Sequence, residues 1–474
     1  MLFFFACVAM LIAGYFVYGS VVEKIFGINE ARTTPCMTKA DGVDYIAMPT
    51  WKVFFIQLLN IAGLGPIIGP ILGALYGPAA LIWVVVGCIL GGAVHDYFSG
   101  MLSIRSGGKS VPELVGDMMG MPARQVMRLF SILLLMLVGV VFIVGPAKLL
   151  GKLTGLDVQL LLGCIFLYYF VATILPIDKL IGRLYPFFGA LLVFMTVGVL
   201  GGMIFQGYEI LPNLDFATNT EPNGKPIWPL LFITISCGAI SGFHATQSPL
   251  MARCINNEKN GRPVFFGSMI MEGIIALIWV TVGLSFHGNV GEYSEVLSNG
   301  GWSAFVNLVC NTLLGPVGGI IAILGVIILP ITSGDTAFRS TRLIIAEIFK
   351  VEQKEAMKRL IIAVPLFIFA YCITMVDFMT IFRYFGWSNQ VLSMLMLWTG
   401  AIYLAKKNKF HWICSLPATF MTAVDVTFIL QSNLGFGITG PVTTIIGVGA
   451  AIAALGAFVV LVKPIEGTVW QACN

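Results

Sequence analysis

A few ionisable side chains lie inside long apolar stretches, where a charge is costly and usually marks a functional position. His95 is adjacent to Asp96, and a carboxylate beside an imidazole can carry a coupling proton because histidine titrates near neutral pH. His244 can meet a substrate carboxylate or close a gate, and Glu272 is a lone acid in an apolar run. We predict that His95, Asp96 and Glu272 take part in coupling. The structural alternative for Asp96 is a helix–helix hydrogen bond. Asp425, another lone acid in an apolar run, is interpreted as a structural residue.

A second set of polar residues combines two hydroxyls with a carboxylate. Thr332, Ser333 and Asp335 follow a proline and flank a glycine, which indicates the end of a helix. Oxygen ligands from side chains and opened backbone can bind a hard cation such as Na⁺, and the same groups can serve a proton relay. A capped helix end paired with Arg339 or Arg342 is the structural alternative. We predict an ion-coupling role for the three residues, with Thr332 and Ser333 as candidate sodium ligands.

Two apolar segments are interrupted by glycine and proline near their middles, at residues 61–70 and 236–249. Proline removes a helix hydrogen bond, and glycine lowers helix propensity, so both segments are predicted to unwind. Unwound backbone inside a bilayer is tolerated only where it lines a cavity or is buried in protein. The freed N–H groups and the positive ends of the helix dipoles would face an anionic substrate. The structural alternative is that these glycines only let membrane helices pack closely. The predicted substrate-binding residues are Gly63, Gly65, Pro66, Gly69, Ser236, Gly238, Ser241, Gly242 and His244.

The elements that must position these residues are membrane helices. The chain has 474 residues, of which 58% are hydrophobic and only 11% are charged, against roughly 25% charged in a soluble domain. This composition excludes a soluble multidomain enzyme, a disordered chain and a collagen-like fibre. The apolar runs are continuous and close to the length of roughly 20 residues that a helix needs to cross a bilayer.

We expect an all-α membrane protein with about 13 transmembrane helices. The predicted spans are residues 2–20, 51–75, 78–103, 124–145, 156–175, 184–206, 228–250, 263–286, 316–337, 360–376, 384–405, 411–431 and 440–462. The two interrupted spans are separated by an odd number of steps and therefore run in opposite directions. They can begin two inverted repeats of five helices, each with a discontinuous first helix. The predicted units are an anchor helix and cytoplasmic loop (1–50), two repeats (51–206 and 207–405) and two accessory helices (406–474).

The distribution of basic residues predicts the orientation. If the N-terminus is outside, the inward-facing loops hold all of the Lys and Arg residues except Lys148, Lys152, Lys225 and Arg383. We therefore expect a plasma-membrane protein with its N-terminus outside and its C-terminus in the cytoplasm. Two connections are predicted to form surface helices that shield the bundle or act as gates. One follows the capping-box pattern of Ser110 and Glu113 on the inner face, and the other covers residues 301–314 outside.

The sequence motifs give less support to an enzyme, an ATP-driven pump or a channel. The ten cysteines include no C-x-x-C pair, and those in apolar runs, such as Cys88 and Cys237, are interpreted as small hydrophobic residues. No H-E-x-x-H or phosphate-binding glycine loop occurs. A hydrolase using Ser241 and a histidine lacks a supporting spacing, and a channel lacks a repeated filter loop. We expect a small-molecule substrate and the lipid bilayer as partners, with no cofactor and no nucleic acid, and leave the oligomeric state open.

Four stretches carry a resemblance to a known family: residues 62–72 (AGLGPIIGPIL), 92–110 (GAVHDYFSGMLSIRSGGKS), 231–244 (LFITISCGAISGFH) and 332–342 (TSGDTAFRSTR). The chain resembles the carbon starvation protein family (CstA), whose members are described as peptide transporters or pyruvate/proton symporters. That family is placed with the inverted-repeat transporters of the amino acid–polyamine–organocation type.

The resemblance implies uptake of peptides or of a small carboxylate such as pyruvate, driven by an ion gradient, with a proton favoured over sodium. It makes the two interrupted spans the first helices of the repeats, and Thr332 and Ser333 a fit for the hydroxyl pair of a sodium site. The chain departs from many members in having His95 where they have Gln, and its C-terminal region is shorter than in the long members. The resemblance leaves the choice between peptide and pyruvate open.

Overall fold

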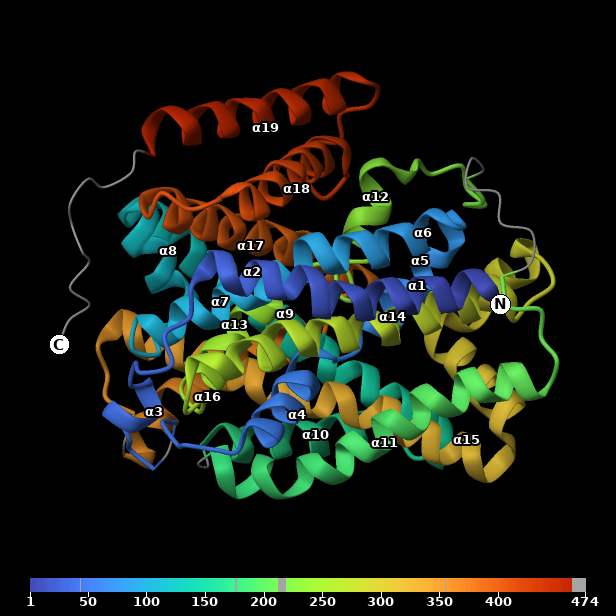
Figure 1. Ribbon diagram of the computed structural model, residues 1–474. Coiled ribbons are helices and arrows are strands. Elements are labelled where there is room, and N and C mark those ends of the chain that lie inside the picture. The colour runs from blue at the N-terminus through green and yellow to red at the C-terminus, as the bar shows by residue number, and fades with distance from the viewer. Residues whose placement is uncertain (43, 175–176, 212–218, 354, 463–474) are drawn as a thin grey trace.

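Helices are the regular elements throughout the part of the chain that the computed structural model describes, residues 1–42, 44–174, 177–211, 219–353 and 355–462 (Figure 1). Side chains are described for these residues except 177–186. Most of the long helices lie side by side, with their axes close to one common direction. This arrangement confirms the predicted all-α class, since no strand occurs among the described residues.

The first half of the chain runs from the N-terminal helix to the end of α11. Its α-helices are α1 (Leu2–Ala13), α2 (Gly19–Phe26), α3 (Pro35–Thr38), α4 (Thr50–Ile61), α5 (Gly65–Gly73), α6 (Ala79–Ile82), α7 (Ala93–Arg105), α8 (Val111–Met119), α9 (Met121–Thr154), α10 (Val158–Ile174) and α11 (Ile177–Phe205). A π-helical stretch at Gly14–Tyr18 joins α1 to α2, and another at Trp83–Gly92 joins α6 to α7, so each pair forms one continuous rod.

The second half contains the second interrupted span and the longest helix. Its α-helices are α12 (Ile227–Thr234), α13 (Gly242–Ala252), α14 (Ser268–Ser285), α15 (Val290–Phe349), α16 (Ala356–Ile373), α17 (Phe378–Lys406), α18 (Trp412–Gln431) and α19 (Val442–Leu461). Arg262–Gly267 is π-helical and leads into α14.

Among the described residues, 9 helices are long and apolar enough to cross a bilayer, or up to 10 when the bent pair α4–α5 is taken as one span. The remaining predicted spans correspond to α10, to the α12–α13 pair and to α17. These three are shorter, interrupted or more polar, so the total of 13 stays a prediction.

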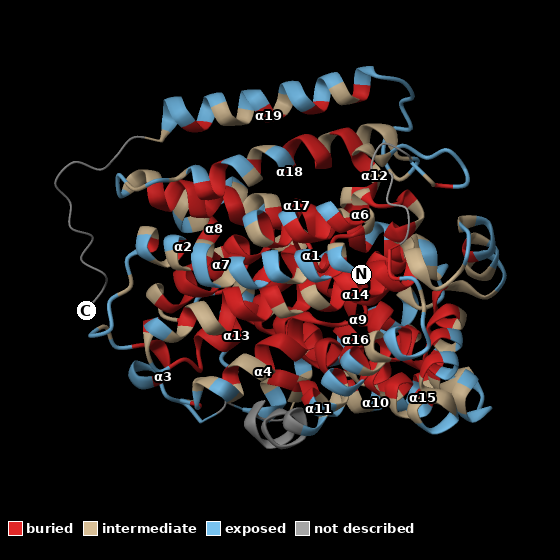
Figure 2. Ribbon diagram, turned by 45° about the vertical axis from the view of Figure 1, so that its right-hand side comes forward, coloured by how far each residue is buried: buried red, intermediate tan, exposed pale blue. Residues whose placement is uncertain are grey.

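Burial separates a central group of helices from a peripheral one (Figure 2). Every residue of α13 is buried, and so is all of α7 except its last residue. By contrast, only 17% of the apolar window of α19 is buried, and this helix lies along α18 at the edge of the bundle. The polar candidates of the sequence analysis therefore come from helices that are enclosed by other helices.

The long helix α15 differs from the prediction. Gly301 (φ 68°) and Gly315 (φ 66°) break it in the left-handed region and so bracket the predicted surface helix. The predicted helix end beyond Pro330 is wrong, because the helix continues to Phe349. Hydroxyls donate to backbone carbonyls next to the proline, from Tyr169 to Pro330 O (2.8 Å) and from two α15 side chains to Leu329 O.

The predicted surface helix after Ser110 is present as α8, but its capping box is not formed. The Ser110 side chain makes no capping bond and donates to Glu347 of α15 instead. Glu113 is paired with Arg128 of α9 at 2.6 Å. A contact with neighbouring helices thus replaces the local pattern, because charge-assisted hydrogen bonds are stronger than neutral ones.

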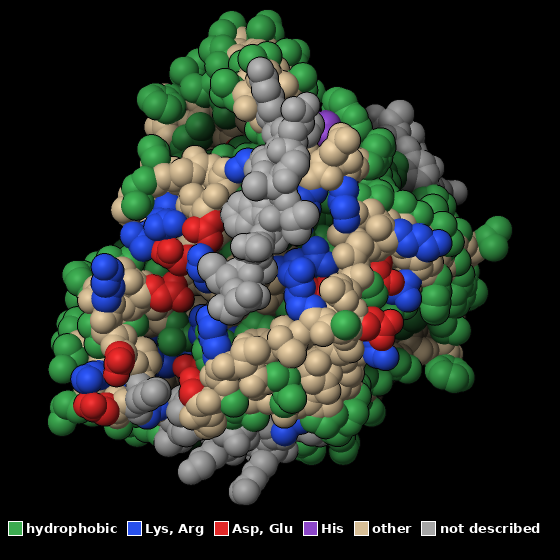
Figure 3. All heavy atoms as spheres, turned by 60° about the vertical axis from the view of Figure 1, so that its left-hand side comes forward, with side chains coloured by type: hydrophobic (Ala, Val, Ile, Leu, Met, Phe, Trp, Pro, Cys, Tyr) green, Lys and Arg blue, Asp and Glu red, His purple; other side chains and the backbone are tan. Residues whose placement is uncertain are grey.

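One end of the bundle, near α3, gathers Lys, Arg, Asp and Glu side chains (Figure 3). Contacts join several of the loops predicted to face inward: Lys39 Nζ donates to Gly107 O (2.9 Å), and Arg105 pairs with Glu258 (2.8 Å). Four basic residues of the orientation argument lie outside the described side chains: Lys179, Arg183, Lys354 and Lys463.

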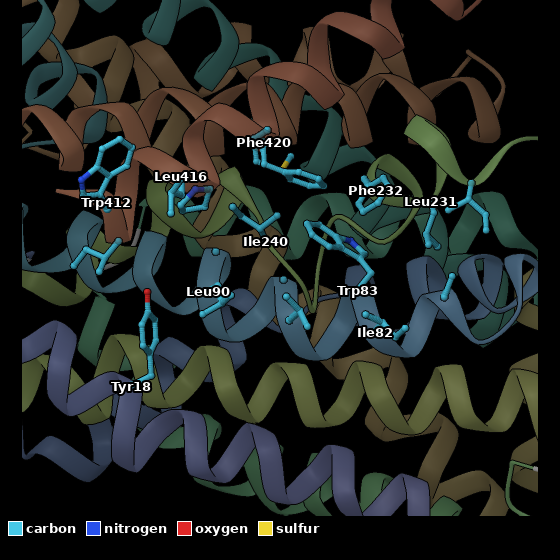
Figure 4. Close-up of a pocket in the computed structure, with 18 of the residues that line it drawn as sticks. Tyr18, Ile82, Trp83, Leu90, Leu231, Phe232, Ile240, Trp412, Leu416 and Phe420 are labelled. Atoms are coloured by element: carbon cyan, nitrogen blue, oxygen red, sulfur yellow. The ribbon is translucent and has the colours of Figure 1, made fainter. Parts of the chain in front are cut away.

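An apolar groove of about 640 Å³ lies between the Ala79–Gly92 rod, α12 and α18 (Figure 4). Trp83, Phe232 and Phe420 line it together, and Ile240 contributes from the second interrupted span. None of the predicted polar site residues lines this groove. Its apolar wall suits the hydrocarbon of a bilayer rather than a polar substrate.

Candidate substrate and ion site at the two helix breaks

The first break separates α4 from α5 at residues 62–64 and bends the span by 48°. Ending α4 at Ile61 leaves carbonyls near its C-terminus without helix partners. Leu59 O accepts hydrogen bonds from the hydroxyls of Thr332 (3.1 Å) and Ser333 (2.9 Å) on α15. The predicted hydroxyl pair therefore lies at the end of the first half-helix, which sequence distance alone does not show.

The second break is longer and separates α12 from α13 at residues 235–241. Gly238 has a φ of +88°, a left-handed conformation that glycine adopts at little cost. The opened carbonyl of Ile235 accepts a hydrogen bond from the indole N–H of Trp83 (2.9 Å). Both predicted interruptions are thus real breaks, but each is shorter than the stretch predicted to unwind, because residues 65–70 belong to α5 and residues 242–249 to α13.

The first turns of α5, directly after the first break, contact the second break and the end of α12. A Cβ added to Gly65 would lie 2.3 Å from Cys237 Sγ, and one added to Gly69 would lie 2.8 Å from Thr234 O. A Cβ on Gly238 would approach Pro66 at 3.9 Å. The glycines therefore allow the start of α5 to pack closely against the second interrupted span.

Buried ionisable side chains from three helices form a connected cluster beside the second break. His244 Nδ1 on α13 lies 2.9 Å from Asp96 Oδ2 on α7, and its Nε2 lies 3.2 Å from Glu272 Oε2 on α14. His95 Nδ1 contacts the other Asp96 oxygen at 2.8 Å. All four side chains are 0% exposed. Buried carboxylates need such partners, because an unpaired charge in a low-dielectric interior is very costly.

Cys237 adds a thiol to this cluster. Its Sγ, a ring nitrogen of His244 and a carboxylate oxygen of Glu272 all lie within 4.8 Å of one another. The interpretation of Cys237 as a small hydrophobic residue missed this position. The available signal was its place in the same interrupted segment as His244.

The first turn of α13 is already hydrogen-bonded in this arrangement. The Phe243 N–H donates to Asn389 Oδ1 of α17 at 2.6 Å, and Asn389 Nδ2 lies 3.1 Å from Ser241 Oγ. One N–H at the start of α13, that of Phe243, is therefore covered by a carboxamide. Asn389 was not among the predicted site residues, although Asn389 and Gln390 form a polar pair inside an apolar span.

The remaining predicted glycines are sites of close helix packing. A Cβ on Gly63 would lie 2.4 Å from the Phe142 ring, and one on Gly242 would lie 2.3 Å from the backbone oxygen of Asn389. Ser236 is 5% exposed and belongs to the second break. The alternative of glycine as a packing residue thus holds beside the predicted role at a break.

Asp335 lies with basic side chains rather than with the histidine cluster. Its Oδ1 is 4.0 Å from Arg339 Nη2, and Arg339 Nη1 is 3.9 Å from Asp44. Arg339 also donates to Ala172 O at 2.7 Å. Asp425 is 4% exposed on α18, outside the two breaks.

A helical membrane protein in which two broken spans meet beside buried polar side chains has the architecture of a secondary transporter. A family comparison agrees with this class. The chain belongs to the carbon starvation protein CstA family, whose model matches residues 1–150, 143–289 and 286–428.

Several relatives are similar over long stretches. An uncharacterized membrane protein of Haemophilus influenzae is 47% identical over 352 residues, 63% of this chain and 95% of that protein. The peptide transporter CstA of Bacillus subtilis is 26% identical and covers 88% of each chain. The pyruvate/proton symporter BtsT of Escherichia coli is 26% identical over 58% of this chain and 47% of its own length. The chain is accordingly a membrane transporter.

Two solved structures share the fold. A manganese transporter of Eremococcus coleocola aligns with a TM-score of 0.57 at 11% identity, covering 89% of this chain and 97% of its own. A Na⁺-coupled sialic acid symporter aligns with a TM-score of 0.56 at 12% identity, covering 97% and 99%. At this identity the likeness concerns the fold and not the cargo.

Proposed function

We propose that the protein is an ion-coupled secondary transporter of the plasma membrane that imports a small carboxylate, such as pyruvate, or a peptide. The observation that carries this proposal is the contact between the start of α5, directly after the first break, and the second break, with the buried histidine–carboxylate cluster beside it. The names of the relatives supply the substrate classes, and a proton is the coupling ion that the BtsT name favours.

The substrate carboxylate would bind at the first turn of α13. In the present arrangement Asn389 Oδ1 accepts the hydrogen bond of the Phe243 N–H. A carboxylate oxygen is a stronger acceptor than a carboxamide oxygen, and the positive end of the helix dipole favours it. Substrate would therefore displace Asn389 and loosen the contact between α13 and α17, which is the kind of differential binding that shifts a transporter between states.

The coupling proton would be held in the cluster of His95, Asp96, His244 and Glu272. The two carboxylates share one imidazole between them, so a proton that arrives on any member is stabilised by the others. Because the four side chains come from α7, α13 and α14, a change in their charge acts on the packing of three helices at once.

The hydroxyl pair of Thr332 and Ser333 supports a second candidate ion, Na⁺. Leu59 O and the two hydroxyls bring three oxygens together at the first break, and a hard cation prefers oxygen ligands. In the present arrangement both hydroxyls donate to Leu59 O, so a cation would have to displace these hydrogen bonds.

Uptake into proteoliposomes tests the transport proposal and identifies the ion. Radiolabelled pyruvate and a radiolabelled dipeptide are offered with an inward proton gradient, with an inward Na⁺ gradient, or with neither. We expect accumulation above the external concentration of one substrate, driven by the proton gradient and abolished by a protonophore. Equilibration without accumulation under every gradient would instead indicate a channel.

The proposed orientation places the charged end of Figure 3 in the cytoplasm, with the N-terminus outside. The joined basic loops support it, since positive residues are retained on the cytoplasmic side. Reporter fusions after Lys259 and after Gly288 test it: the first should report a cytoplasmic and the second an external location. The reverse pattern would contradict the orientation without affecting the transport proposal.

A further inference from the structure

We propose that Cys237, His244 and Glu272 form a binding site for a thiophilic divalent cation such as Zn²⁺. The three ligand atoms lie within 4.8 Å of one another, and the side chains are 2%, 0% and 0% exposed. A tetrahedral Zn²⁺ ion with bonds of about 2.0–2.3 Å separates its ligand atoms by roughly 3.3 Å. The distance of 3.2 Å between His244 Nε2 and Glu272 Oε2 already has this value.

The surroundings of His244 have the form of a metal-ligating histidine. Its Nδ1 is hydrogen-bonded to Asp96 Oδ2 at 2.9 Å, which leaves Nε2 as the nitrogen that faces Glu272. Metal-bound histidines typically donate their other ring N–H to a carboxylate, which sets the tautomer and the direction of the ring. Asp96 is in turn held by His95 at 2.8 Å, so the orienting group is itself fixed.

Two of the three residues that would bind the metal have ligand atoms without hydrogen bonds of normal geometry, whereas Cys237 Sγ contacts Ser241 Oγ (3.5 Å) and Asn389 Nδ2 (3.8 Å). Both carboxylate oxygens of Glu272 and the Nε2 of His244 are buried without such a partner among the described residues. A buried carboxylate in this condition is costly. A cation held between the carboxylate, the imidazole and the thiolate would satisfy all of them.

The ligand types indicate the class of metal. A thiolate favours soft or borderline ions, and an imidazole suits zinc and its neighbours, whereas Mg²⁺ and Ca²⁺ prefer oxygen ligands alone. Cys237 lies in the unwound segment, one residue before the left-handed Gly238, so its backbone can adjust to bring Sγ closer. Three protein ligands leave a fourth position for water.

A bound metal would tie the unwound segment to α13 and α14, because its ligands come from all three. The ion would also occupy groups assigned above to coupling, so it would compete with transport. The site itself is inferred from ligand geometry and does not depend on the proposed symport.

Cobalt spectroscopy on the purified, detergent-solubilised protein tests the site without any transport measurement. Co²⁺ is added as the probe, and the thiolate-to-cobalt charge-transfer band and the visible d–d bands are recorded. We expect both in the wild type and in Cys254→Ser, a control at a buried cysteine away from the cluster. In Cys237→Ser the charge-transfer band should disappear, and Glu272→Gln should weaken binding at least tenfold.

Thermal unfolding of the unaltered protein keeps the test decisive if a variant fails to fold. Zn²⁺ should raise the Tm of the wild type by about 2 °C or more at saturation, because it binds the native state, and Mg²⁺ should not. A wild type with neither a cobalt band nor a zinc-dependent rise in Tm would overturn the site. A cobalt band that persists unchanged in Cys237→Ser would overturn the assignment to Cys237. Lack of ion-driven uptake in vesicles would leave either result untouched and would contradict only the proposed function.

Discussion

The two helix breaks arise from the same kind of sequence pattern but differ in chemistry. The first, at residues 62–64, is short, and its opened carbonyl at Leu59 is held by two hydroxyls of α15. The second, at residues 235–241, is longer and lies against imidazole, carboxylate and thiol groups. The first break thus offers neutral oxygens that suit a hard cation, and the second offers groups that bind protons or softer metals.

This difference shows that glycine and proline decide where a span opens, whereas neighbouring helices decide what the opening can bind. The polar groups beside the first break are the hydroxyls of Thr332 and Ser333 on α15. Those beside the second break include the carboxylates of Asp96 on α7 and Glu272 on α14. The predicted inverted repeat relates the positions of the two breaks, and the contacts show that it does not make them equivalent. The following substitutions test this contrast.

The largest effect is expected at His244, the shared partner in the second break. His244→Ala leaves Asp96 and Glu272 buried without their common imidazole, at a cost on the order of 3–5 kcal/mol. Ion-driven accumulation in proteoliposomes should fall to background, and the Tm of the purified variant should drop. His287→Ala, in a connection outside the cluster, is the control and should transport normally. Normal accumulation by His244→Ala would remove the cluster from the mechanism.

Methyl groups at the glycines should affect the second break more than the first. In Gly242→Ala the new Cβ lies 2.3 Å from a backbone oxygen of α17, which cannot move alone, so we expect a loss of about 1–3 kcal/mol or more and little transport. In Gly65→Ala the obstacle is the side chain of Cys237 in an unwound segment, so part of the activity should remain.

Gly163→Ala on α10 is the matched control, since a Cβ there has nothing within 4 Å. It should express and transport like the wild type, with a stability that is equal or slightly higher. Thermal unfolding and initial uptake rates are measured for all three variants. Equal tolerance of Gly65→Ala and Gly242→Ala would contradict the proposed difference in packing between the breaks.

A substitution at Asp335 tests whether this residue has a coupling role or a structural one. Asp335→Asn removes a charge that lies 4.0 Å from Arg339, which still has Asp44 at 3.9 Å. We expect a moderate loss of stability, about 1–2 kcal/mol, with the proton dependence of uptake retained. Asp96→Asn should instead abolish that dependence. If Asp335→Asn alone makes uptake independent of the proton gradient, the coupling site lies on α15 and not at the second break.

The smallest effect is expected for the hydroxyls at the first break. Thr332→Val and Ser333→Ala each remove a hydroxyl contact with Leu59 O, and such bonds in membrane proteins contribute about 0.6 kcal/mol on average. Each single variant should show a slightly lower Tm and a nearly normal proton-driven uptake. If the double variant loses uptake while keeping its Tm, the pair binds an ion that transport requires, and the assignment of the proton would have to be revised.

The helices, the two helix breaks and the family could be predicted from the sequence. The apolar runs predicted the helices, the glycine and proline clusters predicted both breaks, and the matching motifs predicted the family. Predictions based on short-range spacing were weaker. The capping box of Ser110 and Glu113 gave way to contacts with other helices, and α15 continues through Pro330.

The contacts that site residues make with distant helices could not be predicted from the sequence. Asn389 on α17 holds the first turn of α13, and Cys237 lies near Glu272 of α14. Both relations join residues that are far apart in the sequence. Isolated polar residues in apolar spans mark themselves as unusual without showing which of them meet.

By itself, the sequence determined that the chain crosses a membrane repeatedly as helices and opens two of them, because hydrophobicity, glycine and proline act on the backbone within a few residues. Only the tertiary structure decided that Asp96, His244 and Glu272 share one cluster while Asp335 joins Arg339. Those contacts depend on how whole helices rotate and pack against one another, and packing sums many weak interactions over the entire bundle.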